Sequence, residues 1–294
     1  MTLLRCCLAR AALVGFPALA PLVAPPLAPA LAAQAADTGR TIHRGVEAEA
    51  RPPARLFTVQ DAYLAAGFGA ATVALAPVDR QMAEELQDPR TQTNRFFRHA
   101  ATGFRVLGFP GAPIIGGGLY VVGRIGHYDR VADLGLHSTE AILLGGGITS
   151  LIKGLAGRAR PYVSADTSPH DFQFGRGLDR SGDYASFPSG HSTAAFAAAA
   201  AVTTETARLW PRSTWYVGPI MYGGAAMVGL SRMYNNKHWA SDVAVGAAIG
   251  TFSGLKVTRY HHAHPDNRLD RLLLSAVVVP AARGGATVAW GARW

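Results

Sequence analysis

The chain has 294 residues, of which 49% are apolar and 16% are charged, and its formal net charge is +9. This composition excludes a disordered chain and is typical of a globular or membrane-embedded protein with a large core. A positive charge of this size suits an anionic substrate, an acidic membrane surface or nucleic acid. Because the sequence has no zinc-finger, RNP-type or helix-turn-helix pattern, we expect no nucleic-acid partner.

The first 35 residues have the pattern of a cleaved secretory signal. Arg5 and Arg10 stand near the start, and an apolar run leads to the small residues Ala33-Gln34-Ala35. A retained transmembrane helix is the alternative, but repeated prolines would interrupt it. Both cysteines, Cys6 and Cys7, lie in this leader, so the mature chain would contain no disulfide. We predict export to the periplasm, with membrane association or integral insertion as the alternative.

The rest of the chain divides into three parts. Residues 36–57 are polar and predict a linker or N-terminal arm, and residues 58–262 predict a helical catalytic domain. Residues 263–294 form a C-terminal segment, in which the apolar runs Leu272–Val279 and Ala286–Trp290 predict a β-hairpin packed on the helical body. The helical segments are Thr58–Leu75, Phe104–Val122, Thr139–Ala156, Ser192–Arg208, Trp215–Leu230 and His238–Val257. We therefore predict an all-α bundle of about six core helices.

Charged residues interrupt several of these segments. Lys153, Glu205 and Lys256 shorten the third, fourth and sixth segments below the ~20 apolar residues of a membrane span, which leaves the second and fifth long enough. This pattern favours a soluble or peripheral domain. The long polar stretch Tyr162–Phe187 predicts a loop over the functional pocket.

The first chemical motif is Lys153, six further residues, and Arg160-Pro161. Seven positions make about two helical turns, so the two cations can share one face of a helix that ends at the proline. Such cations could bind an anion. Basic residues near a helix C-terminus are also commonly solvated, so this motif by itself leaves both readings open.

The second motif, Ser189-Gly190-His191, stands directly before an alanine-rich helical segment. A helix start offers backbone N–H groups to an anion, although Ser189 could equally be a plain N-cap. In the third motif Arg232 precedes His238, and Asp242 follows that histidine by four residues. On one helix face Asp242 would orient the imidazole of His238, but a surface pair or a pair of metal ligands has the same spacing.

Together, in order and spacing, these motifs resemble the signature of the type 2 phosphatidic acid phosphatase (PAP2) and vanadium haloperoxidase superfamily. The resemblance runs from Lys153 to Asp242. It implies a PAP2-type helical fold and a phosphatase closest in character to bacterial exported acid phosphatases. The substrate would be a soluble phosphomonoester or a lipid phosphate.

The resemblance also implies a role for each residue. His238 would attack phosphorus to form a phosphohistidine, Asp242 would orient it, and His191 would protonate the leaving alcohol and then activate water. The remaining residues would bind the phosphate without a metal or another cofactor, because fixed cations and amides already face the anion. They are Lys153, Arg160, Ser189, Gly190 and Arg232.

Two alternatives remain open from sequence. A vanadium-dependent haloperoxidase would hold vanadate in the same anion site, but such enzymes are commonly longer. A non-catalytic phosphate- or lipid-binding envelope protein would keep the fold without the chemistry, which the presence of His191, His238 and Asp242 disfavours. The oligomeric state is not readable from the sequence.

Overall fold

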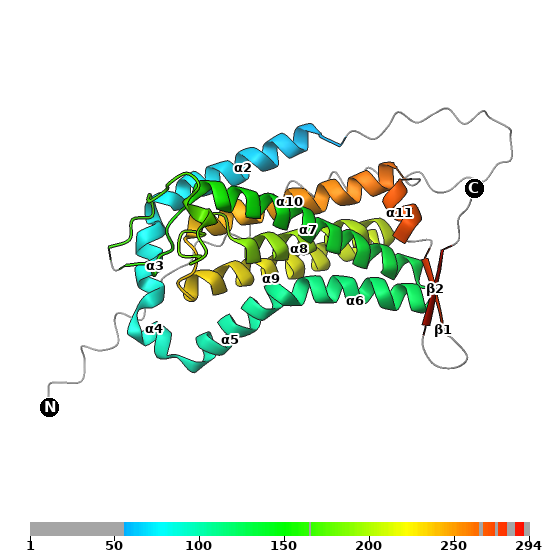
Figure 1. The fold of residues 1–294 in the computed structure, drawn as a ribbon, viewed down its shortest axis with the longest axis horizontal. Coiled ribbons are helices and arrows are strands. Elements are labelled where there is room, and N and C mark those ends of the chain that lie inside the picture. The colour runs from blue at the N-terminus through cyan, green and yellow to red at the C-terminus, as the bar shows by residue number, and fades with distance from the viewer. Residues whose placement is uncertain (1–55, 165, 265–266, 274–275, 281–285, 291–294) are drawn as a thin grey trace. The chain divides into compact units, whose positions relative to one another are not determined.

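The computed structural model describes residues 56–164, 166–264, 267–273, 276–280 and 286–290. The expected signal peptide and nearly all of the expected linker therefore lie outside the described residues. Within the described part the protein is a helical bundle with a single two-stranded hairpin near its C-terminal end (Figure 1). The predicted all-α fold is confirmed.

The bundle contains long helices joined by short connections and one long loop. The helices are α2 (Val59–Leu75), α3 (Asp79–Gln87), α4 (Pro89–Thr93), α5 (Arg95–Val106), α6 (Ala112–Ile125), α7 (Asp129–Ala156), α8 (Gly190–Leu209), α9 (Thr214–Tyr234), α10 (Ala240–Ala263) and α11 (Arg268–Leu273). The hairpin pairs β1 (Ala276–Pro280) with β2 (Ala286–Trp290) in antiparallel register, with Ala276 opposite Trp290.

Helix α8 is the centre of the bundle, since it packs against α7, α9 and α10 (Figure 1). Six of its alanines are buried, four of them completely, and three glycines spaced four residues apart on α10 face it. A Cβ on Gly246 would lie 2.5 Å from the Ser189 carbonyl oxygen, and a Cβ on Gly250 would lie 2.3 Å from that of Thr193. Only small residues allow this approach, which sets the start of α8 directly against α10.

The predicted second helix is in fact two helices. Phe109, between α5 and α6, has extended backbone angles of φ −157° and ψ 128°, and it is followed by Pro110. Proline has no N–H to continue the helical hydrogen bonds, so α5 and α6 are set at an angle. The expectation of one continuous helix over Phe104–Val122 was wrong.

Several predicted boundaries also change. The third helix begins ten residues earlier than Thr139, at Asp129, and the sixth begins at Ala240 instead of His238. Leu272 and Leu273, expected at the start of a strand, belong to α11, and the first strand begins only at Ala276. β1 lies against α6, as expected for a hairpin that cannot be stable alone.

Many large apolar side chains on the outer helices are exposed, contrary to what a soluble bundle would bury. Exposed residues include Val59, Tyr63 and Val73 on α2, Ile114, Ile115 and Val122 on α6, and Leu143 and Leu151 on α7. Two stretches, Val59–Gln87 and Arg95–Ile125, are long and apolar enough to cross a membrane. We expected the second and fifth helical segments to be long enough for a membrane span, and this was right for the second and wrong for the fifth. The first segment reaches that length instead, because α3 extends it.

Candidate active site

The eight residues singled out from the sequence lie together at one end of the bundle. Lys153 is in the last turn of α7, Arg160 follows that helix, and Ser189, Gly190 and His191 begin α8. Arg232 is in the last turn of α9, and His238 and Asp242 flank the start of α10. The Ser189 N–H donates to the Asp242 carbonyl at 3.0 Å, and this bond joins the second motif to the third.

His238 and Asp242 do not share a helix face as predicted. His238 precedes the helix, whose N-cap is Trp239, and Asp242 occupies the first turn, where it accepts the Trp239 N–H at 2.9 Å. The carboxylate is thus used as a cap, which an acidic residue in the first turn favours. Nδ1 of His238 lies 3.6 Å from Oδ2 of Asp242, so the two are in electrostatic contact but not at hydrogen-bond length.

Asp242 is fully buried and is held from several sides. The Ser186 hydroxyl donates to Oδ2 at 2.5 Å, and the Arg158 guanidinium donates to Oδ1. Burial raises the pKa of Asp242, but contact with His238 and the charge of Arg158 outweigh it, so the pKa lies below its usual range. Asp242 is therefore a fixed negative charge beside the imidazole.

Arg158 connects this carboxylate to a second one. It is 3% exposed, and besides Asp242 it donates to Asp79 at 2.8 Å. Asp79 in turn accepts the Ser241 N–H at 2.9 Å. Two buried carboxylates therefore share one guanidinium, and helix α3 is tied to the start of α10.

The long loop Tyr162–Phe187 holds the cations through its backbone carbonyls. Lys153 Nζ donates to the Ala185 oxygen at 2.6 Å and, just past the loop, to the Pro188 oxygen at 2.8 Å. Arg160 Nε donates to the Gly182 oxygen at 2.8 Å. Burial, together with the charge of Arg160, lowers the pKa of Lys153 to about 8. The loop therefore orients the side chains of Lys153 and Arg160, a more specific role than the expected one of covering the pocket.

Arg232 is buried yet lacks a full set of partners. It is 7% exposed, and among the described residues its Nε has no hydrogen-bond partner. Burial, and then the charges of Arg160 and Arg105, lower its pKa to about 10, so it stays cationic at neutral pH. A buried guanidinium with an unused donor beside other cations is a site for an anion.

Both histidines of the site are neutral at neutral pH. Burial is the main reason that the pKa of His238 falls to about 3. Burial and the nearby charge of Arg232 lower the pKa of His191 to about 4. A neutral imidazole has a lone pair, so either ring can act as a nucleophile or a base.

The start of α8 supplies backbone donors. Ser189 is the N-cap, and its hydroxyl oxygen accepts from the Ser192 N–H at 3.4 Å and from the Ser192 hydroxyl at 2.9 Å. The Ser189 side chain therefore caps the helix, as its alternative reading held. Amides in the first turn of a helix have no partner within the helix, so those of Gly190 and His191 can still face an anion.

Sequence reasoning left out four charged residues that the structure places in or behind this site. Arg158 and Lys237 adjoin the motifs, and the charge of Lys237 is coupled to those of Arg160 and Arg232. Arg105 on α5 acts electrostatically on His191 and Arg232. Arg105 and Asp79 belong to helices α5 and α3, which lie outside the three motifs. No local sequence pattern identifies either of them as a residue of the site.

Known proteins resemble this chain across the same region. Residues 135–266 match the family model described as PAP2 superfamily. Over 69 residues the chain is 46% identical to lipid A 1-phosphatase of Porphyromonas gingivalis, and this stretch makes up 24% of the chain but only 15% of that protein. A transmembrane PAP2 type phosphatidylglycerolphosphate phosphatase from Bacillus subtilis has a crystal structure with a TM-score of 0.47 and 22% identity to this chain. That similarity covers 72% of this chain and 99% of the other.

Proposed function

We propose that this chain, in which residues 135–266 match the PAP2 superfamily model, is a membrane-embedded phosphatase that hydrolyses lipid phosphomonoesters through a phosphohistidine at His238. The observation that carries the proposal is buried Arg232 with its unused Nε, close to the charge of Arg160 and to a neutral His191. A phosphate group would supply the missing acceptor.

Lipid substrates are favoured over soluble esters for two reasons. Apolar side chains cover the outer faces of α2, α6 and α7, and two stretches of helix have the length and composition of membrane spans. The P. gingivalis relative is named for action on a lipid phosphate. An enzyme embedded in a bilayer has direct access to lipids, so a membrane location favours a lipid ester as the substrate.

In the first chemical step the lone pair of His238 Nε2 attacks phosphorus, and the bond from phosphorus to the ester oxygen breaks. Asp242 lies on the Nδ1 side of the ring and stabilises the positive charge that the imidazole gains. His191 donates a proton to the departing alkoxide. Because burial and the surrounding cations keep His191 neutral, it takes up this proton when the phosphate dianion binds and offsets those cations.

In the second step neutral His191 accepts a proton from water, and the water oxygen attacks phosphorus as the N–P bond breaks. Lys153, Arg160 and Arg232 oppose the charge on the equatorial oxygens in both steps. Phosphate leaves, His238 regains its lone pair, and the proton on His191 returns to solvent.

The test is phosphate release by the full chain in mixed micelles, with phosphatidic acid as lipid substrate and an aromatic phosphomonoester as soluble substrate. We expect a kcat/KM at least about tenfold higher for the lipid, from binding energy outside the phosphate. Equal or better hydrolysis of the soluble ester would reject the lipid assignment. Phosphate binding without release from either ester would reject the enzyme, and halide oxidation with added vanadate and peroxide would replace it with a haloperoxidase.

A further inference from the structure

A second group of titratable side chains lies far from the phosphate pocket. On α7, His137 comes 16 residues before Lys153, which is about 24 Å along the helix. On α10, His261 is 19 residues beyond Asp242, or about 28 Å. We call this group the His137 cluster; it consists of His137 and Glu140 on α7, Glu205 on α8, His261 and His262 on α10, and Asp270 on α11.

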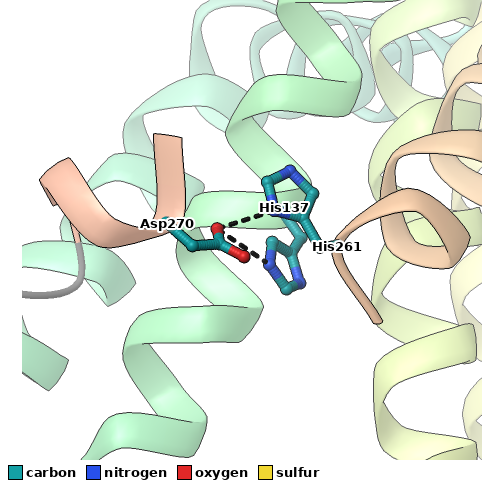
Figure 2. Close-up of side chains that lie close together, drawn as sticks. All are labelled: His137, His261 and Asp270. Carbon is teal, nitrogen blue, oxygen red and sulfur yellow. Dashed lines mark ion pairs between the residues drawn. The ribbon is translucent and has the colours of Figure 1, made fainter. Parts of the chain in front are cut away.

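At its centre, two imidazoles face one carboxylate (Figure 2). Oδ1 of Asp270 lies 2.6 Å from Nδ1 of His261 and 3.9 Å from Nε2 of His137. The His137 and His261 side chains are both 3% exposed. Among the described residues, neither His137 Nε2 nor Asp270 Oδ1 has a partner in hydrogen-bond geometry. Buried polar atoms are rarely left in this state, so His137 Nε2 is open to a ligand, and Asp270 Oδ1 has only its ion pair with His261.

Outer carboxylates determine which ring nitrogen carries the proton. Nδ1 of His137 lies 2.7 Å from Oε1 of Glu205, and Nε2 of His261 lies 2.5 Å from Oε2 of Glu140. A carboxylate accepts the proton of the nitrogen that it contacts. The opposite nitrogen of His137 therefore presents its lone pair toward Asp270, whereas Nδ1 of His261 shares a proton with Asp270 that a bound metal ion would displace.

Asn267 holds the Asp270 carboxylate beside His261. The Asp270 N–H donates to Oδ1 of Asn267 at 2.9 Å, which fixes the orientation of the amide. Its two Nδ2 protons go to the His264 carbonyl at 2.8 Å and to Asp270 Oδ2 at 2.6 Å. Oδ1 of Asp270 is therefore left beside Nδ1 of His261, where a metal ion can replace the proton that these two atoms share.

We propose that His137, His261 and Asp270 bind a divalent transition-metal ion of the Zn²⁺ type. Zn²⁺ bonds of about 2.0–2.2 Å place tetrahedral ligand atoms about 3.3 Å apart, and the observed separations of 2.6 and 3.9 Å lie on either side of that value. All three ligand atoms lie within 4.8 Å of one another. The rings, now stacked at 4.3 Å, tilt apart to direct both lone pairs at the ion.

The neighbouring trio of His137, Glu205 and His262 is a weaker candidate. Both oxygens of Glu205 are already used in ordinary hydrogen bonds, at 2.7 Å to His137 and at 2.8 and 3.0 Å to His262. Glu205 instead resembles the outer carboxylate that orients a metal-bound histidine. The ion joins α7, α10 and α11, and its distance from the phosphate pocket makes it a structural ion outside the phosphoryl transfer.

The test is metal binding by the full chain in detergent, purified with a tag that contains no histidine. We expect about one Zn²⁺ per chain by mass spectrometry, and visible absorption bands of tetrahedral Co²⁺ after exchange. Asp270→Asn and His137→Gln should lose this stoichiometric binding. His264, an exposed histidine that directly follows α10, provides the matched control, and His264→Gln should keep the binding.

Glu140→Gln keeps all three ligands and should weaken Zn²⁺ binding by about 10–100-fold, which tests the site even if the ligand variants do not fold. Folding is checked by helical circular dichroism. A chelator should lower the Tm of the wild type and of His264→Gln but not that of Asp270→Asn. Wild-type protein that binds no more Zn²⁺ or Co²⁺ than Asp270→Asn would overturn the proposal and leave a proton-linked ion-pair network in its place.

Discussion

Arg158 and Asp242 form a buried ion pair behind the phosphate pocket, with side chains 3% and 0% exposed. The same guanidinium reaches Asp79 on α3, so the carboxylate beside His238 is fixed by a buried residue that is itself tied to α3. Arg158 is therefore a positioning residue, and its contribution to stability can be measured separately from its effect on catalysis.

Replacing Arg158 by Met should destabilise the protein by about 3–5 kcal/mol, because two buried carboxylates lose their shared cation. The measurement is the unfolding midpoint in detergent, together with kcat for the folded fraction, which should also fall. Arg80→Met is the control: its guanidinium is on the surface and reaches loop carbonyls at 3.2 and 3.4 Å, so the cost should stay within about 0.5 kcal/mol. Equal losses in the two variants would contradict the role given to Arg158.

Replacing Gly250 by Ala should destabilise the bundle by about 1–3 kcal/mol, because the new Cβ would lie 2.3 Å from the Thr193 carbonyl oxygen. Gly223→Ala on α9 is the matched change, since nothing lies within 4 Å of its added Cβ. There the better helix propensity of alanine should add up to about 1 kcal/mol. Thermal unfolding followed by circular dichroism distinguishes the two, and a stable Gly250→Ala protein would mean that α8 and α10 can move apart freely.

His238→Ala should abolish turnover and covalent labelling by radioactive phosphate ester, because no other ring takes its place as nucleophile. His191→Ala should still be labelled by esters with activated leaving groups, which depart without a proton. His99→Ala, an exposed histidine on α5, should behave as the wild type. Undiminished labelling of His238→Ala would remove that residue from the mechanism.

The pKa of His191 should rise when phosphate binds. Burial and the charges of Arg232, Arg105, Lys153 and Arg160 hold this pKa at about 4, and a bound dianion would offset those charges. The pH titration of its ring signals by NMR, with and without inorganic phosphate, measures this change. A titration unaffected by phosphate would mean that the anion binds elsewhere.

The low pKa of His191 also determines how the free energy of unfolding changes with pH. A folded value of about 4 lies below the ordinary 6.5, so between these values the unfolded chain binds more protons than the folded one. The contribution of His191 is fully present above pH 6.5 and is lost as the pH falls toward 4. His191→Gln should therefore flatten the acid side of the stability curve in urea unfolding between these two pH values.

Much of the fold and the site could be predicted from sequence, because the relevant signals are local. Helical composition located most of the bundle, and short motifs contained His191, His238 and Asp242. The errors arose where local pattern competes with tertiary context. His238 looked helical, yet Asp242 caps a helix that begins only at Ala240, and Pro110 divided a segment that composition alone made continuous.

The sequence by itself pointed to the residues of the proposed phosphate site, since motif spacing along a chain needs no knowledge of how the helices pack. Only the tertiary structure decided that Asp79 and Arg105 join this site, that the outer helices expose apolar side chains, and that His137, His261 and Asp270 converge at a separate place. These residues come from different helices, and contacts between them depend on close helix packing, such as that of α8 against the glycines of α10, which no short stretch of sequence encodes.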